Sequence, residues 1–414
     1  MRDQQLYEHL LDIRSPWKVD RVEINDTSLE IIVHLELEDS ARLRCPKCNR
    51  ECPGYDRRKN TWRHLDTCEY KTLLTGRVPR VECPEHGVQM VDVPWAEGRT
   101  KYTMKFESLV ISWLQETTVA AVERRMRLNW KAVNKIKERA VARGLARREA
   151  QYPEHISIDE TSFQKRHEYV TVVTDQRTGA VLWVGEDRKA ASLNAFFASL
   201  TPDQIFRIQT VSLDMWAPFI ASICDNLPDA MSKICFDRFH VHQIISRALD
   251  QVRRAEHRIM LQQGESVLTG AKYILLRNPE KMPRSEKSLM ATIQQYAAKT
   301  ARAWRLMQVA TGMWEFIRRG WAERAWKSWI RMANSSRLAP MKKAAATIKK
   351  HMYGIVNAII HGVNNGHAES ANSRIQLVKS RARGYRTKER FITAIYFYCG
   401  KLDLLPRNQA IAFN

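Results

Sequence analysis

The sequence predicts a multidomain protein in which a β-rich metal-binding part, a helical part and an α/β part follow one another. Cysteines concentrate in the first fifth of the chain, between residues 45 and 83. Apolar residues then recur every three or four positions through residues 101–150, a spacing typical of helices. From residue 155, short apolar runs with the period of β-strands return and alternate with helical stretches. This order favours separate β, α and α/β domains.

The charge of the chain indicates a polyanionic partner. Its 414 residues include 67 Lys and Arg against 45 Asp and Glu, giving a net charge of +22 and an isoelectric point of about 9.8. Such an excess favours nucleic acid. No apolar run reaches the roughly 18 residues of a membrane span. The first residues, MRDQQLYEHLLDIR, lack the apolar core of a secretion signal, so we expect a cytoplasmic protein without a membrane partner.

Two short motifs predict a zinc site within a β-rich domain at residues 1–98, where residues 19–37 alternate like a hairpin. Cys45 and Cys48 form a C-P-x-C motif, and Cys83 and His86 form a C-P-x-H motif. Each two-residue spacer lets a tight turn direct both ligands to one ion. Four protein ligands complete a tetrahedral site, so we expect one structural Zn²⁺. Unrelated surface cysteines are the competing interpretation, and three nearby residues are substitute ligands: Cys52, His64 and Cys68.

Residues 99–150 predict a helix-turn-helix DNA-binding domain. Two helices are joined at residues 127–129, and Asn129 is a suitable N-cap for the second. The turn has Arg127 where glycine is usual, and a plain helical bundle is the competing interpretation. In a helix-turn-helix the second helix enters the major groove. The residues that this helix is expected to present to DNA are Trp130, Lys131, Asn134, Lys135 and Lys137.

Residues 151–262 predict an α/β domain with a mixed five-stranded sheet. The expected strands are 155–158, 169–174, 181–184, 208–213 and 234–236, with helices at 191–200 and 218–226. Asp159 ends the first strand and Asp214 the fourth, so the two carboxylates are neighbours if those strands lie side by side. With a third acid, Glu369, they can hold two divalent metal ions over a phosphodiester. Asp237 and His240 follow the fifth strand, where His240 either positions the phosphate or caps a helix.

The remaining sequence predicts an all-helical insertion at 263–350 and a second part of the α/β domain at 351–414. The tryptophans of the insertion are expected to form an aromatic core, with stacking on flipped bases as the alternative. Glu369 lies on a helix whose apolar stripe, Ala368, Ala371, Ile375 and Val378, packs on the sheet. A basic run after it is expected to grip phosphates: Arg374, Lys379, Arg381, Arg383, Arg386 and Lys388.

Four segments together resemble the DDE transposases of the ISL3 family of bacterial insertion sequences. They are SIDET (157–161), VSLDMW (211–216), FDRFHV (236–241) and GHAESANSRI (366–375). The acids are separated by 55 residues (214 − 159) and then by 155 residues (369 − 214). The longer gap leaves room for the helical insertion that such transposases place before the last acid. The resemblance covers nearly the whole chain.

The resemblance implies a ribonuclease H-like catalytic domain and the chemistry of DNA transposition. Asp159, Asp214 and Glu369 would hold two catalytic Mg²⁺ ions, for which Mn²⁺ can substitute, with Asp159 bridging both. The protein would bind terminal inverted repeats in double-stranded DNA, cleave there, and join the freed 3′-hydroxyl to target DNA without a covalent enzyme intermediate. Pairing of two ends favours a homodimer, associated with the bacterial nucleoid.

Two other functions fit parts of the same sequence. A ribonuclease H-like nuclease or resolvase would hydrolyse DNA and never join it. A zinc and helix-turn-helix regulator would bind DNA with acids that are only structural. A joining assay distinguishes a transposase from the nuclease or resolvase. Metal-dependent nicking of DNA excludes the regulator.

Overall fold

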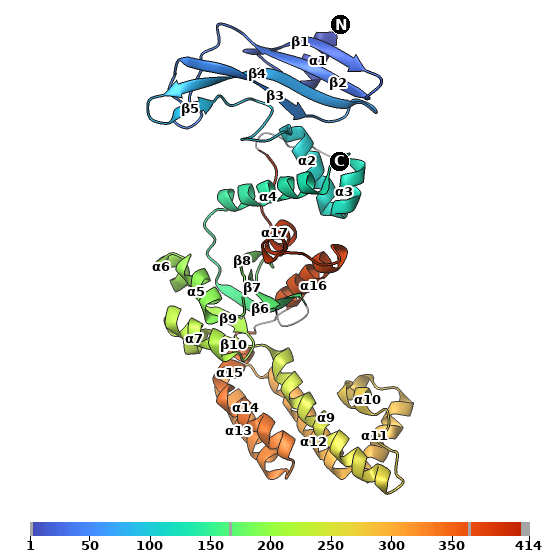
Figure 1. Ribbon diagram of the computed structural model, residues 1–414. Coiled ribbons are helices and arrows are strands. Elements are labelled where there is room, and N and C mark those ends of the chain that lie inside the picture. Colours follow the sequence, from blue (N-terminus) through green and yellow to red (C-terminus); the bar gives the residue numbers. More distant parts are fainter. Residues whose placement is uncertain (1–2, 165–167, 363–365, 407–414) are drawn as a thin grey trace. The chain divides into compact units, whose positions relative to one another are not determined.

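The computed structural model of the protein describes residues 3–164, 168–362 and 366–406, without the side chains of residues 366–369 (Figure 1). The chain forms two compact units. Unit 1 contains residues 1–148 together with the C-terminal residues from Leu402 onward, and unit 2 contains residues 149–401. The described residues 402–406 therefore belong to the same unit as the N-terminal part of the chain.

Unit 1 begins with a five-stranded sheet in the order β1-β2-β4-β3, with β5 paired to β4. The predicted hairpin is confirmed, because β1 and β2 pair antiparallel from Trp17↔Leu37 to Asn25↔Glu30. The sheet also contains three strands beyond that prediction, and β4 pairs parallel to β2. Three tryptophans, Trp17, Trp62 and Trp95, pack edge to face in its core, with ring centroids 4.9 and 5.3 Å apart. The elements are α1 (Asp3–Leu11), β1 (Trp17–Asn25), β2 (Glu30–Leu37), β3 (Gly54–Arg63), β4 (Lys71–Cys83) and β5 (Gly87–Met90).

Three helices complete unit 1, namely α2 (Met104–Glu116), α3 (Val119–Arg125) and α4 (Trp130–Arg147). Each begins at a polar side chain that accepts a hydrogen bond from the backbone of the first turn, at Thr103, Thr118 and Asn129. The predicted cap at Asn129 is confirmed, since its Oδ1 accepts from the Ala132 N–H at 2.9 Å.

The turn between α3 and α4 lacks glycine because Arg127 itself adopts a left-handed conformation, with φ of 51°. This backbone conformation costs a non-glycine residue roughly 1–2 kcal/mol. The Arg127 guanidinium donates to the Glu69 carbonyl at 3.0 Å and pairs with the Asp66 carboxylate. These contacts fix the α3–α4 turn against the sheet of unit 1 and offset the strain.

The C-terminal segment 402–405 lies against α4. A Cβ on Gly144 would meet Leu402 Cβ at 2.7 Å, so glycine permits the close approach. Arg143 donates to the Leu404 carbonyl at 2.8 Å, and Arg147 pairs with Asp403 at 3.1 Å. Segment 402–405 thus covers one face of α4.

Unit 2 contains a mixed five-stranded sheet in the order β10-β9-β6-β7-β8. β7 pairs antiparallel with β6 and β8, whereas β9 pairs parallel with β6 and β10 parallel with β9. All five strands were expected from the sequence. They are β6 (His155–Gln164), β7 (Glu168–Asp175), β8 (Val181–Gly185), β9 (Thr210–Leu213) and β10 (Ile234–Phe236).

Helices cover both faces of this sheet. Ile156, Ile158 and Val173 face one hydrophobic core, while Val170 and Val172 face another. Successive residues of a strand point to opposite faces, so the strongly apolar β7 has both faces buried. The first core contains helices α5 (Ala190–Ala198), α7 (Ala217–Asn226) and α15 (Met352–Ile360), and the second contains α16 (Gly366–Arg381) and α17 (Lys388–Cys399). Two short helices, α6 (Pro202–Arg207) and α8 (Ala230–Lys233), join these elements to the strands.

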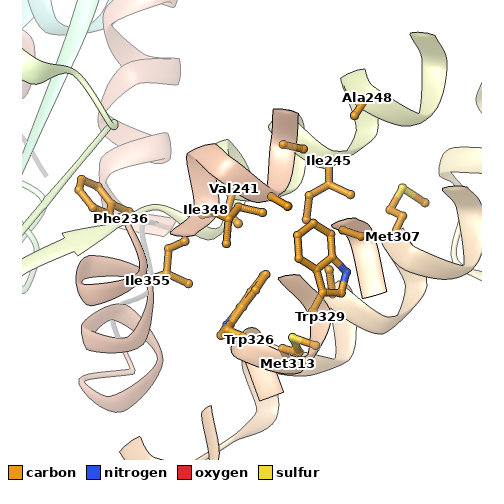
Figure 2. Close-up of a cluster of buried hydrophobic side chains, with 14 of the residues drawn as sticks. Phe236, Val241, Ile245, Ala248, Met307, Met313, Trp326, Trp329, Ile348 and Ile355 are labelled. Carbon is orange, nitrogen blue, oxygen red and sulfur yellow. The ribbon is translucent and has the colours of Figure 1, made fainter. Parts of the chain in front are cut away.

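The segment 263–350 is helical in the structure, and its hydrophobic core is continuous with that of the sheet. Phe236 of β10, Val241 and Ile245 of α9, and Ile355 of α15 lie in one cluster with the buried Trp326 and Trp329 (Figure 2). Trp329 donates from Nε1 to the Leu306 carbonyl at 2.8 Å. The core interpretation of these two tryptophans is therefore confirmed. The helices are α9 (Arg238–Gln262), α10 (Lys272–Leu276), α11 (Arg284–Tyr296), α12 (Ala298–Gly312), α13 (Arg319–Ser335) and α14 (Ala339–Lys350).

Candidate active site and metal centre

Two aspartates occupy equivalent positions on adjacent parallel strands. The pairing of β6 with β9 runs from His155↔Thr210 to Ser157↔Ser212. Asp159 and Asp214 each lie two residues beyond the last paired serine, and Asp214 directly follows the end of β9. One expectation is corrected, because β6 does not end at Ile158 but continues to Gln164 through its pairing with β7. Asp159 therefore lies within β6, just beyond the point where its pairing with β9 ends.

Asp159 is held by donors from two elements. The Asn372 side-chain amide on α16 donates to Oδ2, and the Glu160 backbone N–H donates to Oδ1 at 2.6 Å. Burial raises the pKa of Asp159 above its ordinary value, and the nearby charge of Asp214 raises it further. A buried carboxylate beside a second one favours a cation between them.

His240 joins Asp214 to the end of β10. Its Nε2 lies 2.6 Å from Asp214 Oδ1 and 3.8 Å from Asp237 Oδ2. Burial alone would lower the pKa of His240, but the hydrogen bond and charge of Asp214 outweigh it and raise that pKa. Asp237, not His240, caps helix α9, since its Oδ1 accepts from the Phe239 N–H at 2.9 Å. His240 therefore contacts Asp214 as an ion-pair partner.

A fourth acid, Glu160, directly follows Asp159 on β6. Its side chain is only 13% exposed and pairs with Arg188 Nε at 2.6 Å. Burial raises the pKa of Glu160 to about 7, Arg188 opposes that rise, and Asp214 and Asp159 add to it. The Arg188 guanidinium also lies 4.1 Å from the ring centroid of Trp216. Sequence alone gave no signal for this pairing, because Arg188 comes from the loop between β8 and α5.

The third predicted acid, Glu369, lies on helix α16 as expected, and its side chain lies outside the described residues. The apolar stripe that should pack this helix on the sheet is buried at Ala371, Ile375 and Val378, while Ala368 also lies outside the described side chains.

The predicted phosphate-binding run divides into two groups. Arg374 donates to the Gly179 carbonyl at 3.0 Å, Lys379 to the Ser162 carbonyl at 2.7 Å, and Lys388 lies 3.3 Å from Asp187. These three half-buried residues hold α16 and α17 to the sheet and its loops. The exposed members of the run are Arg381, Arg383 and Arg386.

Four predicted ligands in unit 1 lie together. Single ligand atoms of Cys45, Cys48, Cys83 and His86 are all within 4.8 Å of one another. Burial opposes ionisation of Cys83, but backbone N–H donors of Glu85 and His86 outweigh it and lower the pKa of that thiol to about 7. Three sulfur atoms and one imidazole nitrogen form a donor set that suits tetrahedral zinc.

The substitute ligands are placed elsewhere. Cys52 is buried near this cluster, but its Sγ contacts the Arg50 carbonyl at 3.4 Å and it is not one of the four. His64 is buried against Thr103, with Nδ1 2.9 Å from its hydroxyl, and Cys68 is exposed.

Helix α4 carries the residues predicted to read DNA, and the structure corrects two of them. Trp130, Lys131 and Lys135 are exposed, whereas Asn134 and Lys137 are only 5% and 3% exposed. Asn134 donates to the Trp130 carbonyl of its own helix at 2.9 Å. Because α4 packs against α2, α3 and segment 402–405, its buried face is wider than the predicted stripe of Val133, Ile136 and Ala140.

A family model of the ISL3-type DDE transposases matches residues 156–395, more than half of the chain. The chain belongs to the ISL3 family of DDE transposases. A second model, a zinc finger of the transposases of IS204, IS1001, IS1096 and IS1165, matches residues 41–86, which contain the four clustered ligands. The sequence-level resemblance and the zinc-binding N-terminal region are thus confirmed.

Two relatives match this transposase over nearly its full length. It is similar to the transposase of insertion sequence element IS1557 from Mycobacterium tuberculosis, with 29% identity over 443 residues covering 98% of each chain. It is also similar to the transposase of IS1001 from Bordetella parapertussis, with 27% identity over 404 residues, covering 95% of this chain and 98% of the relative. The protein is a DNA transposase. Within the described part of the transposase, no helix has both the length and the apolarity to span a membrane.

Proposed function

We propose that this transposase cleaves DNA at the ends of its insertion sequence and joins them to target DNA, using Asp159, Asp214 and Glu369 as its catalytic acids. The observation that carries the proposal is that Asp159 and Asp214 each lie two residues beyond the last residue pair of β6 and β9, Ser157↔Ser212. Acids that follow the paired residues of two adjacent parallel strands lie beside each other at the same edge of the sheet. The charge of Asp214 also contributes to the raised pKa of Asp159.

The third acid is supported by its place on α16. Asn372 on that helix reaches Asp159, and Glu369 precedes Asn372 by three residues. Residues three apart share one face of a helix. Position 369 therefore lies on the same face of α16 as Asn372, the residue that contacts Asp159.

A ribonuclease H-like fold for the α/β domain is supported by the topology of the sheet. Three antiparallel strands in sequence order, β6, β7 and β8, are extended beside β6 by the parallel strands β9 and β10. Helices from both sides cover this sheet, as the family resemblance implies. The five segments expected from the sequence remain our proposed domain division, with residues 263–350 as an insertion into the catalytic domain.

The donor set of the three acids suits Mg²⁺, which prefers carboxylate oxygen. Asp159, Asp214 and Glu369 would hold two such ions. Bound there, the ions would activate the attacking oxygen and stabilise the leaving one. His240 holds the Asp214 carboxylate through its 2.6 Å contact, and Asn372 holds Asp159. Both partners fix the orientation of an acid before DNA arrives.

DNA recognition is assigned to the α2–α4 helices, read as a helix-turn-helix, and to the exposed basic residues after α16. The three-residue joint at 127–129 and the exposed Trp130, Lys131 and Lys135 of α4 support major-groove binding of a terminal repeat. Zinc at Cys45, Cys48, Cys83 and His86 would stabilise the adjacent sheet. Cytoplasmic action as a homodimer on two paired ends completes the proposal.

The test is a cleavage and joining assay with labelled duplex copied from the end of the element and a plasmid target. The wild-type protein with Mg²⁺ should nick the duplex and join it to the plasmid. Asp159→Asn, Asp214→Asn and Glu369→Gln should each abolish both products while duplex binding remains within about twofold. Cleavage by Asp159→Asn at the wild-type rate would refute the assignment, and cleavage without joining would favour a nuclease.

A further inference from the structure

Arg188 is fixed at the edge of the candidate active site by three side chains. Its Nε lies 2.6 Å from the Glu160 carboxylate. Its guanidinium carbon lies 4.1 Å from the ring centroid of Trp216 and 5.6 Å from that of Tyr169. An arginine held by a carboxylate at Nε and by an aromatic ring on its face keeps its two terminal nitrogens at a defined edge.

Trp216 lies beside Asp214 and stays in contact with solvent. It is two residues beyond that acid, and its backbone N–H donates to the Asp214 carbonyl at 2.7 Å. The side chain is 37% exposed although Arg188 covers part of the ring. The neighbouring Met215 packs on the hydrophobic core of unit 2, whereas Trp216 is not among the described residues of that core. Core packing therefore does not account for a large aromatic residue at this position.

We propose that Trp216 stacks on a nucleobase next to the scissile phosphate, and that Arg188 binds a phosphate of the same strand. This inference rests on the proposed function, because it places the cleaved strand at Asp159 and Asp214. Bases within a duplex have both faces covered by neighbouring pairs, so a side chain can stack only on a base that has left its pair. The transposase would thus hold the end of the element locally open.

The chemistry of the pair suits this role better than a purely structural one. Glu160 pairs with Nε of Arg188, and the indole of Trp216 packs on the face of the guanidinium. The two terminal nitrogens form a planar fork that matches the spacing of phosphate oxygens. Stacking on an indole is tolerant of base identity, so the contact does not depend on which base lies beside the scissile phosphate.

The experiment compares two labelled duplexes from the end of the element, one fully paired and one with the base beside the scissile phosphate mismatched. Trp216→Ala should cleave the paired duplex about tenfold more slowly than wild type. On the mismatched duplex the deficit should shrink to about twofold, because the base is already free. Trp216→Phe should retain most activity on both, and Arg188→Ala should slow both equally, since the phosphate is present in each. An equal deficit of Trp216→Ala on both duplexes, or none on either, overturns the inference.

A matched control is Trp321→Ala. Trp321 on α13 is also exposed, at 55%, and also stacks with an arginine, Arg318 at 5.8 Å. This variant should cleave both duplexes like wild type, and all variants should unfold at the wild-type temperature.

A direct readout uses 2-aminopurine at the mismatched position in duplex bound without Mg²⁺. Wild-type protein and Asp159→Asn should both quench its fluorescence, and Trp216→Ala should not. Quenching that persists in Trp216→Ala contradicts the stacking. If Asp159→Asn cleaves DNA, the assignment of the catalytic acids is wrong. The fluorescence measurement tests the stacking of Trp216 independently of that assignment.

Discussion

Asn372 donates a hydrogen bond to the carboxylate of Asp159, although 213 residues separate them in the chain. The contact joins helix α16, which follows the helical insertion, to the first strand of the sheet. It also defines which face of α16 is turned toward Asp159, a proposed catalytic acid. The insertion lies between the two in sequence and leaves their contact intact.

Replacement of Asn372 should weaken the metal site without unfolding the protein. Asn372→Ala removes the donor that orients Asp159, and loss of such a supporting contact typically costs 10–100-fold in metal affinity or activity. We expect cleavage to need roughly tenfold more Mg²⁺ for half its maximal rate. A magnesium titration of cleavage measures this. Ser373→Ala, at the exposed next position, is the control. An unchanged titration for Asn372→Ala would show that the contact has no functional role.

Zinc removal should destabilise unit 1. Purified protein should carry about one zinc ion per chain, and Cys48→Ala should lose it, because three remaining ligands hold zinc poorly. We expect a lower melting temperature and exposure of the 41–86 region to protease. Zinc content by mass spectrometry checks the first point. Cys68→Ala changes an exposed cysteine outside the cluster and should keep the metal. Full zinc content in Cys48→Ala would exclude Cys48 as a ligand.

Lys131 and Lys135 should contribute phosphate contacts. The double variant Lys131→Ala/Lys135→Ala should bind end DNA more weakly, with the slope of log affinity against log salt reduced by about 2. Fluorescence anisotropy at several salt concentrations measures the slope. The control, Lys342→Ala/Lys343→Ala, removes two exposed lysines of α14 and should leave the slope unchanged. Identical slopes for both double variants would place the terminal-repeat contact elsewhere than α4.

His64 should make the stability of unit 1 depend on pH. Burial lowers the pKa of His64 to about 3, while in the unfolded chain the imidazole takes a proton near pH 6.5. Below pH 6.5 the unfolded state therefore binds a proton that the folded state excludes, and stability falls as the pH falls. Between pH 7.5 and 5 this amounts to about 2 kcal/mol. Urea unfolding at both pH values should show this loss in wild type, and His64→Asn should lack that part of it. Equal pH dependence in the two proteins contradicts the prediction.

The sheet of unit 2 could be predicted because its strands are short apolar runs and its helices are amphipathic. The length of β6 could not, since Glu160 to Gln164 has no clear alternation and is held in the strand by pairing with β7. The strands β3 and β4 escaped prediction for a related reason. β3 begins with exposed polar residues, and only its long-range pairing with β4 specifies it.

In the candidate site, residue type and position relative to the strands were sufficient to predict that Asp159 and Asp214 are neighbours. The contacts that support them come from loops and helices distant in sequence, as with Arg188 and Asn372. On α4, Lys137 was read as a surface residue because lysine usually is. Lys137 is buried on a helix that packs against α2, α3 and segment 402–405, and a local pattern does not encode such long-range packing.

The segment 402–405 has a consequence for biogenesis. Residues 402–405 contact a helix that is synthesised before the whole of unit 2, with Leu402 against Gly144 and Arg143 bound to the Leu404 carbonyl. During translation, this face of α4 stays uncovered until residues 149–401 have been made. A product truncated just before residue 402 would leave that face of α4 exposed, so a truncation that spares all of unit 2 would damage unit 1.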